Sequence, residues 1–143
     1  MFRANTLLSK RYEDHLITLL RFTIALIFAW FGSLKVLGYN PVFELTSNSL
    51  LPFVSSGYGL VGLGLIEVLI GFFLFTNRAL VFTHIALFFH LLGTFTTFFY
   101  GWQVVFKPYF PILSLDGEFV IKNLILTISG LVVLVHESRR RRS

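Results

Sequence analysis

Residues 57–75 read GYGLVGLGLIEVLIGFFLF, an apolar run that carries a single carboxylate, Glu67. A run of about 18 or more apolar residues is long enough for a helix that crosses a lipid bilayer. Three glycines fall with Glu67 within one narrow arc of that helix: Gly57, Gly64 and Gly71. Small residues let a neighbouring helix come close, and an ionised group at membrane depth is costly unless it is paired or neutralised. We therefore expect Glu67 to face protein, opposite a polar partner on another helix.

The composition is that of a membrane protein. Of 143 residues, 55% are hydrophobic and 13% are charged, against roughly 25% charged residues in an ordinary soluble domain. Cysteine is absent, which excludes disulfides, thiolate metal sites, iron–sulfur clusters and covalent c-type haem. No nucleophile–base pair, phosphate-binding loop or metal-ligand motif is apparent, so no catalytic residue and no metal are assigned. The chain is expected to be an integral membrane protein of one domain, and not an enzyme by itself.

Four apolar segments divide the chain. A polar segment at 1–15 and a basic tail at 138–143 enclose a membrane domain at 16–137, with spans expected at about 16–37, 57–75, 79–100 and 119–135. The first segment is about twice as long as the apolar region of a signal peptide and contains Arg21, so we expect it to be retained. A short helix beginning at Asn40 is expected in the 38–56 loop. Four spans with short connections predict an all-α, antiparallel four-helix bundle.

The basic residues indicate an orientation. They collect near both termini and at Arg78, whereas the 38–56 loop has none and the 101–118 linker has only Lys107. By the positive-inside rule both termini are cytoplasmic, and the expected location is a bacterial inner (plasma) membrane, with an organelle membrane as the alternative. The run Arg139, Arg140, Arg141 and Arg142 is expected to set topology and to touch anionic lipid, and no nucleic acid partner is expected.

The polar faces of the four spans predict a buried cluster in the outer half of the bundle. If these faces meet, five side chains converge there: Lys35, Glu67, His90, Lys122 and Asn123. Two ammonium groups facing one carboxylate favour a ligand with acceptor oxygens or negative charge, and His90 can exchange a proton with it.

Each member of this cluster also has a plainer interpretation. Lys35 can extend to the outer surface, and Lys122 can pair with Glu118 four residues earlier. Glu67 can be a structural ion pair or a neutral carboxyl, and His90 can bond a threonine or a carbonyl. His84 lies about 120° from His90 around the helix, so the two cannot ligate one iron and haem is not expected.

Three charged motifs resemble a known family. WFGSLK at 30–35, GLIEVLIG at 64–71 and GEFVIKNLIL at 117–126 occur in that order within four spans and are similar to the DoxX-like family of small bacterial membrane proteins. The resemblance implies a four-helix inner-membrane bundle. It implies that Lys35, Glu67 and Lys122 are this chain's charged family positions. Members of that family are linked to thiosulfate:quinone oxidoreduction and to oxidative-stress responses.

Three functions remain open from the sequence. The first is an accessory subunit of a redox or quinone-linked membrane system, in which the Lys35, Glu67 and Lys122 cluster holds a quinone or an anionic lipid headgroup. The second is a structural or docking subunit of a larger membrane assembly, with charges that fix helix register. The third, a small-solute transporter, is less favoured because no span is interrupted by proline and no inverted repeat is evident. Expected partners are the lipid bilayer and either another protein or a second copy of the chain.

Overall fold

The computed structural model describes residues 2–39 and 57–141, without side chains for 2–9 and 97, and the helix expected from Asn40 lies outside this part of the chain. Its elements are α1 (Phe2–Val36), α3 (Gly57–Thr76), α4 (Leu80–Tyr100), α5 (Trp102–Val105) and α6 (Leu115–Arg140). One backbone bridge, between Phe106 and Leu113, lies in the loop after α5. The described chain is therefore all-helical.

The expectation of four apolar helices is confirmed. Four helical segments are long and apolar enough to cross a membrane: Lys10–Val36, Gly57–Thr76, Leu80–Tyr100 and Leu115–Arg140. The bounds of α1 and α6 differ from those expected. Helix α1 begins at Phe2 rather than near residue 16, because the polar start is rich in good helix formers and extending an existing helix costs little.

Helix α6 also begins earlier than expected, and its first residues explain why. The Ser114 hydroxyl accepts a hydrogen bond from the Gly117 N–H at 3.0 Å, which caps the helix. Asp116 and Glu118 then place negative charge in the first turn, where the helix dipole favours it. The expected start near residue 119 missed this polar first turn, and the helix also continues into the basic tail as far as Arg140.

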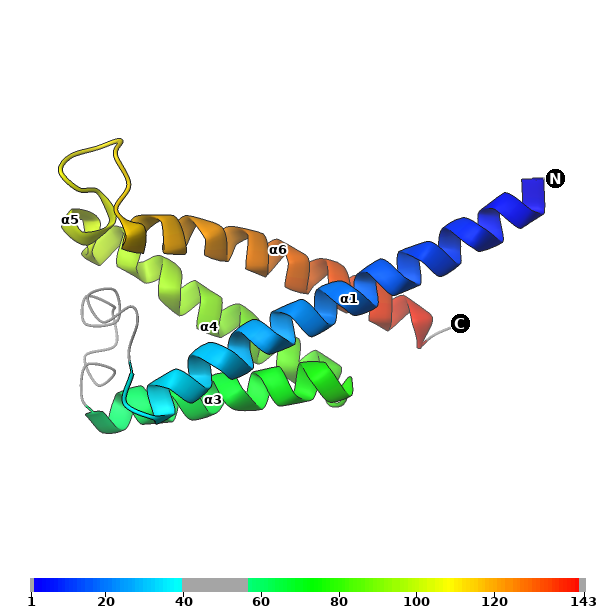
Figure 1. Ribbon diagram of the computed structural model, residues 1–143, viewed down its shortest axis with the longest axis horizontal. Coiled ribbons are helices and arrows are strands. Elements are labelled where there is room, and N and C mark those ends of the chain that lie inside the picture. The colour runs from blue at the N-terminus through cyan, green and yellow to red at the C-terminus, as the bar shows by residue number, and fades with distance from the viewer. Residues whose placement is uncertain (1, 40–56, 142–143) are drawn as a thin grey trace.

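The helices associate as two closely packed pairs (Figure 1). Helix α1 lies along α3, and α4 lies along α6. Both chain ends lie at one end of the structure, where the start of α1 projects past the other helices, and α5 with its loop lies at the opposite end. Contacts between α1 and α3 run in opposite order along the two helices, since Gly32 meets Gly64 and Ala25 meets Gly71.

Glycines allow the backbones of α1 and α3 to touch. A Cβ atom added at Gly71 would lie 2.8 Å from the Ala25 carbonyl oxygen, and one at Gly64 would lie 2.8 Å from the Gly32 carbonyl oxygen. Such distances require the absence of a side chain. A Cβ at Gly57 would meet nothing within 4 Å. Two of the three glycines on the expected arc therefore form the helix contact, and Gly57 does not.

A tight turn joins α3 to α4, as expected. Asn77 follows the end of α3 with a φ of 54°, the left-handed conformation that asparagine tolerates after a helix. Ala79, with a φ of 47°, precedes α4, and its carbonyl accepts the Thr83 N–H at 2.9 Å.

The core is narrow and the outer surface is apolar. Buried residues from all four long helices meet in one cluster: Ile24, Ala25, Phe28, Ile70, Leu74, Leu87, Leu91 and Val133. A smaller cluster of Val105, Phe106 and Val120 lies beneath the α5 loop. No span has more than 29% of its apolar window buried inside the structure. Large side chains such as Leu65, Phe72 and Phe89 point outward instead, as lipid-facing positions do.

Candidate functional site

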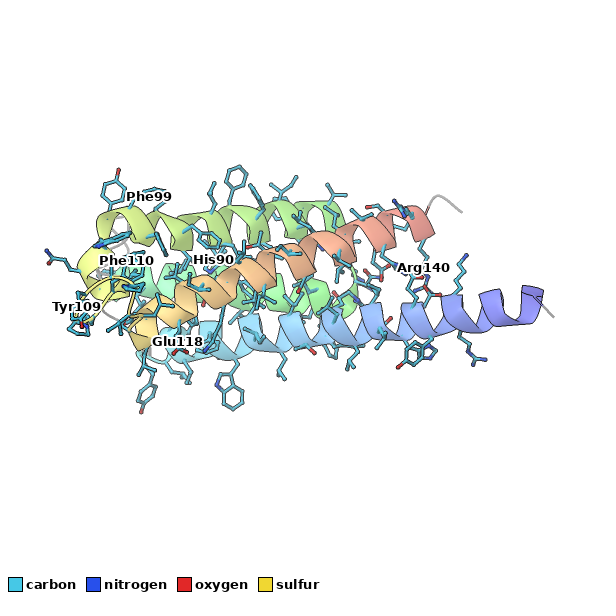
Figure 2. The ribbon with its side chains drawn as sticks, turned by 90° about the horizontal axis from the view of Figure 1, so that it is seen from above. His90, Phe99, Tyr109, Phe110, Glu118 and Arg140 are labelled. Atoms are coloured by element: carbon cyan, nitrogen blue, oxygen red, sulfur yellow. The ribbon has the colours of Figure 1, made fainter. Side chains whose placement is uncertain are left out.

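Three of the expected cluster residues meet in the structure, each from a different helix. The Lys35 ammonium on α1 lies 2.8 Å from Glu67 Oε1 and 2.6 Å from Oε2, on α3. His90 Nε2, on α4, lies 3.1 Å from Glu67 Oε1. Figure 2 shows His90 among the helices, whereas Phe99 points outward. We call these three residues the Lys35–Glu67–His90 cluster.

The local sequence explains how a lysine and a glutamate come so close. Lys35 lies in the last turn of α1, where the helix dipole favours a cation. A Cβ added at Gly64 would lie 2.9 Å from the Lys35 Cβ, and one added at Gly32 would lie 2.8 Å from the Glu67 Cβ. The two glycines therefore provide the space that the ion pair occupies.

The Lys35–Glu67 ion pair is buried. The Lys35 and Glu67 side chains are each 5% exposed, and both carboxylate oxygens contact the ammonium. A buried pair of this kind offsets its own desolvation only when both partners are present, and losing one partner costs about 3–5 kcal/mol. The lysine and the glutamate together carry no net charge. Their contact therefore lowers the free-energy cost of burying both charged groups in apolar surroundings.

His90 extends this pair to a third helix. Since a carboxylate only accepts hydrogen bonds, the contact requires a proton on His90 Nε2. The imidazole packs edge-on against Phe28 with ring centroids 5.4 Å apart. Its side chain is 13% exposed, more than either member of the ion pair. The imidazole is thus the member of the cluster that is most open to its surroundings.

Lys122 does not join the cluster as expected. Its side chain is 68% exposed and bonds Glu118 Oε2 at 2.8 Å, which is the alternative pairing at i, i+4. Helix α6 instead turns Asn123, Gly130 and Val133 inward. The described cluster therefore pairs one lysine with one carboxylate, and the second ammonium group inferred from the sequence is absent from it.

Asn123 is buried, as expected, but none of the hydrogen bonds that hold the Lys35–Glu67–His90 cluster comes from it. Its backbone carbonyl accepts the Thr127 hydroxyl at 2.9 Å.

The sequence analysis missed a second polar group near the chain termini. Arg21 is 7% exposed, and its guanidinium donates to the Leu74 and Phe75 carbonyls at 2.6 and 3.2 Å. These carbonyls belong to the last turn of α3, where carbonyls lack the N–H donors four residues on that satisfy them in the middle of a helix. Arg21 Nε lies 4.0 Å from Glu137 Oε1, and Asn77 Nδ2 donates to Glu137 Oε2 at 3.3 Å. Arg21 is thus a C-terminal cap for α3.

Helix α1 is also tied to α6 at this end. His136 Nε2 lies 2.8 Å from Asp14 Oδ1, and its Nδ1 lies 3.5 Å from Glu13 Oε1. In the sequence, His136 and Glu137 precede four arginines and so resemble the start of an exposed tail. Glu137 is the only acidic side chain among residues 136–143, and this isolated carboxylate was the available signal.

The basic tail is partly engaged with the protein. Arg141 donates to the Asn77 carbonyl at 2.9 Å. Arg139 is exposed, Arg140 lies at the end of α6 (Figure 2), and Arg142 lies outside the described residues. The expectation that all four arginines meet lipid stays a prediction, and for Arg141 it competes with this contact.

Within residues 2–39 and 57–141, no group of three or more His, Asp or Glu side chains is placed to hold a metal ion. No protein-family model, curated protein or solved structure matches this chain. The features that bear on function are therefore the geometry of the Lys35–Glu67–His90 cluster and the apolar surface around it.

Proposed function

We propose that this chain is a non-catalytic structural subunit of the bacterial inner membrane, an antiparallel four-helix bundle that docks onto a larger membrane assembly. The observation that carries the proposal is the charge balance of the buried cluster. A single carboxylate uses both oxygens on Lys35 and shares one with His90, and so links α1, α3 and α4. With its charges satisfied internally, the cluster serves to fix how three spans pack.

The proposed orientation places both termini in the cytoplasm. It is supported by the common end at which both termini lie, together with Arg139 and Arg141 (Figure 1). The chain has no cysteine, so single cysteines can be introduced without removing any. Tyr12, in the first part of α1, and Tyr109, in the loop after α5, are exposed, and these two segments lie at opposite ends of the structure (Figure 1). We expect a membrane-impermeant maleimide to label Tyr109→Cys in intact cells and Tyr12→Cys only after lysis. The reverse pattern would refute the orientation.

The structural role is tested by replacing the ion pair with apolar residues. Glu67→Gln leaves a buried ammonium facing a neutral amide, and we expect a loss of about 3–5 kcal/mol in the free energy of unfolding. Lys35→Met with Glu67→Leu removes both charges and should recover most of that loss, since apolar replacement of a whole buried pair is often neutral. Lys122→Met, which changes an exposed lysine, is the matched control.

The same variants, expressed in cells, distinguish a packing role of the cluster from a ligand-binding role. If the cluster only fixes packing, the double variant restores any phenotype of a deletion strain as well as stability. A double variant that is stable and correctly inserted but fails to restore that phenotype would refute the proposal.

A second candidate is favoured by one contact. His90 places a proton-carrying ring against Glu67 on the more exposed side of the cluster. In this candidate the chain is a DoxX-like accessory subunit of a redox system, and the cluster holds a quinone or an anionic lipid headgroup. We would measure quinone and anionic lipid that co-purify with His90→Gln and with the exposed control His15→Gln. Equal retention by both variants would remove this candidate.

A further inference from the structure

A small pocket lies between α4 and α6, away from the Lys35–Glu67–His90 cluster. Its walls are mainly apolar and come from both helices: His84, Leu87 and Leu91 of α4, and Thr127, Gly130 and Leu131 of α6. The room inside it is about 10 Å³. A cavity needs roughly 10–15 Å³ of such room to hold one water molecule. The pocket therefore has room for about one group of water size.

One side chain in this wall has an unsatisfied atom. His84 is 4% exposed, and its Nδ1 lies 2.7 Å from the Leu80 carbonyl oxygen. Because a carbonyl only accepts, Nδ1 carries the proton of the neutral ring, and Nε2 presents a lone pair. Among the described residues, His84 Nε2 is one of three buried side-chain atoms without a hydrogen-bond partner. Buried polar atoms are seldom left this way in folded proteins.

A second acceptor lines the same pocket. The Thr127 hydroxyl donates its proton to the Asn123 carbonyl at 2.9 Å, so its oxygen is left with lone pairs only. His84 Nε2 and Thr127 Oγ1 are therefore both acceptors, and the backbone carbonyl of Gly130, which lies within hydrogen-bond reach of the His84 ring, is a third; the other lining side chains are aliphatic or aromatic. An occupant that satisfies these acceptors must donate protons.

We propose that this pocket binds a hydroxyl donor of water size, hydrogen-bonded to His84 Nε2 with Thr127 Oγ1 as the second acceptor. A water molecule has two protons and meets both acceptors. The other source of the same chemistry is the hydroxyl end of a membrane-soluble alcohol, because Phe88 and Leu131 at the pocket are exposed on the apolar outer surface. The site does not depend on the function proposed above.

The test is solid-state NMR on the full-length protein in bilayers of chain-deuterated lipid, with ¹⁵N-labelled histidine. We expect magnetisation transfer from the O–H donor to the acceptor nitrogen of His84, whose signal is assigned by its loss in His84→Asn. Transfer from water in alcohol-free bilayers identifies water as the source. Transfer that appears only after a long-chain alcohol is added identifies the alcohol. No transfer under either condition overturns the proposal.

A pair of glycine variants locates the donor. A Cβ at Gly130 would lie 2.7 Å from Leu87 Cδ2, so Gly130→Ala pushes a lining side chain into the pocket. A Cβ at Gly62 would meet nothing within 4 Å, so Gly62→Ala is the control. We expect the transfer to disappear in Gly130→Ala and to persist in Gly62→Ala. Transfer that persists in folded Gly130→Ala overturns the assignment. If Gly130→Ala fails to fold, the transfer measured on the wild-type protein decides the proposal by itself.

Discussion

The α1–α3 contact can be tested with one methyl group. In Gly71→Ala the new Cβ would lie 2.8 Å from the Ala25 carbonyl oxygen and 2.8 Å from the Ala29 nitrogen. Both atoms belong to the backbone of α1, so no side chain can rotate away. The helices must move apart until these distances reach the ordinary contact range of 3.4 Å or more.

The magnitude follows from what that movement disturbs. Overpacking a close contact costs about 1–3 kcal/mol. The same two helices carry the Arg21 contact with Leu74 and the Lys35 contact with Glu67, and both need the present spacing. We therefore expect the upper part of this range. The gain in helix propensity from Gly to Ala works in the opposite direction, by about 0.5–1 kcal/mol.

The assay is reversible unfolding of the purified protein by SDS in mixed micelles, followed by tryptophan fluorescence. Gly62→Ala makes the same chemical change on the same helix, at a position where the new Cβ would meet no neighbouring helix within 4 Å, so it should be neutral or slightly stabilising. Equal stability of Gly71→Ala and Gly62→Ala would show that the two helices do not approach this closely, and the account of the ion pair would fail with it.

Three further substitutions test other contacts by the same assay. Arg21→Met removes charged hydrogen bonds to the Leu74 and Phe75 carbonyls and should lower the free energy of unfolding by about 1.5–3 kcal/mol, with a smaller loss for Arg21→Lys. A loss within error of zero would contradict the capping role. Lys122→Ala breaks only an exposed pair with Glu118 and should leave stability unchanged, whereas a large loss would return Lys122 to the buried cluster. Ala79→Gly should stabilise by up to about 1 kcal/mol because it relieves a left-handed alanine, and destabilisation would argue against that φ.

Much of the fold could be predicted because its signals are local. Apolar runs of sufficient length give the four helices, and the glycine spacing on residues 57–75 marks the face that meets α1. The meeting of Glu67 with Lys35 followed from the same logic, since each shares a helix face with small residues and was expected in one cluster. The helix ends were less predictable, because capping by Ser114 and extension of α1 depend on polar residues outside the apolar pattern.

The rotation of α6 could not be predicted in the same way. Its lipid-facing and protein-facing sides are both apolar, so hydrophobicity alone does not say which stripe faces inward. Lys122 and Asn123 are adjacent in the sequence and so lie on neighbouring sides of α6; both were expected in the cluster, and the structure buries only Asn123. The contacts of Arg21 and Glu137 were missed because they join residues 53 or more positions apart, and those of Arg21 also use backbone carbonyls of α3 as partners.

The Lys35–Glu67 ion pair and the Arg21 contacts join the same two helices, α1 and α3, near opposite ends of α3. Lys35 lies 14 residues after Arg21, about 21 Å along a helix that rises about 1.5 Å per residue. Between these anchors the glycine contacts hold α1 against α3, so the pair is fixed in register at two separated points. The other pair, α4 with α6, attaches at the same two levels, through His90 at one and Glu137 at the other. Weakening the Lys35–Glu67 contact should therefore shift α4, and weakening the Arg21 contact should shift α6. In both cases we expect this shift to occur before α1 separates from α3.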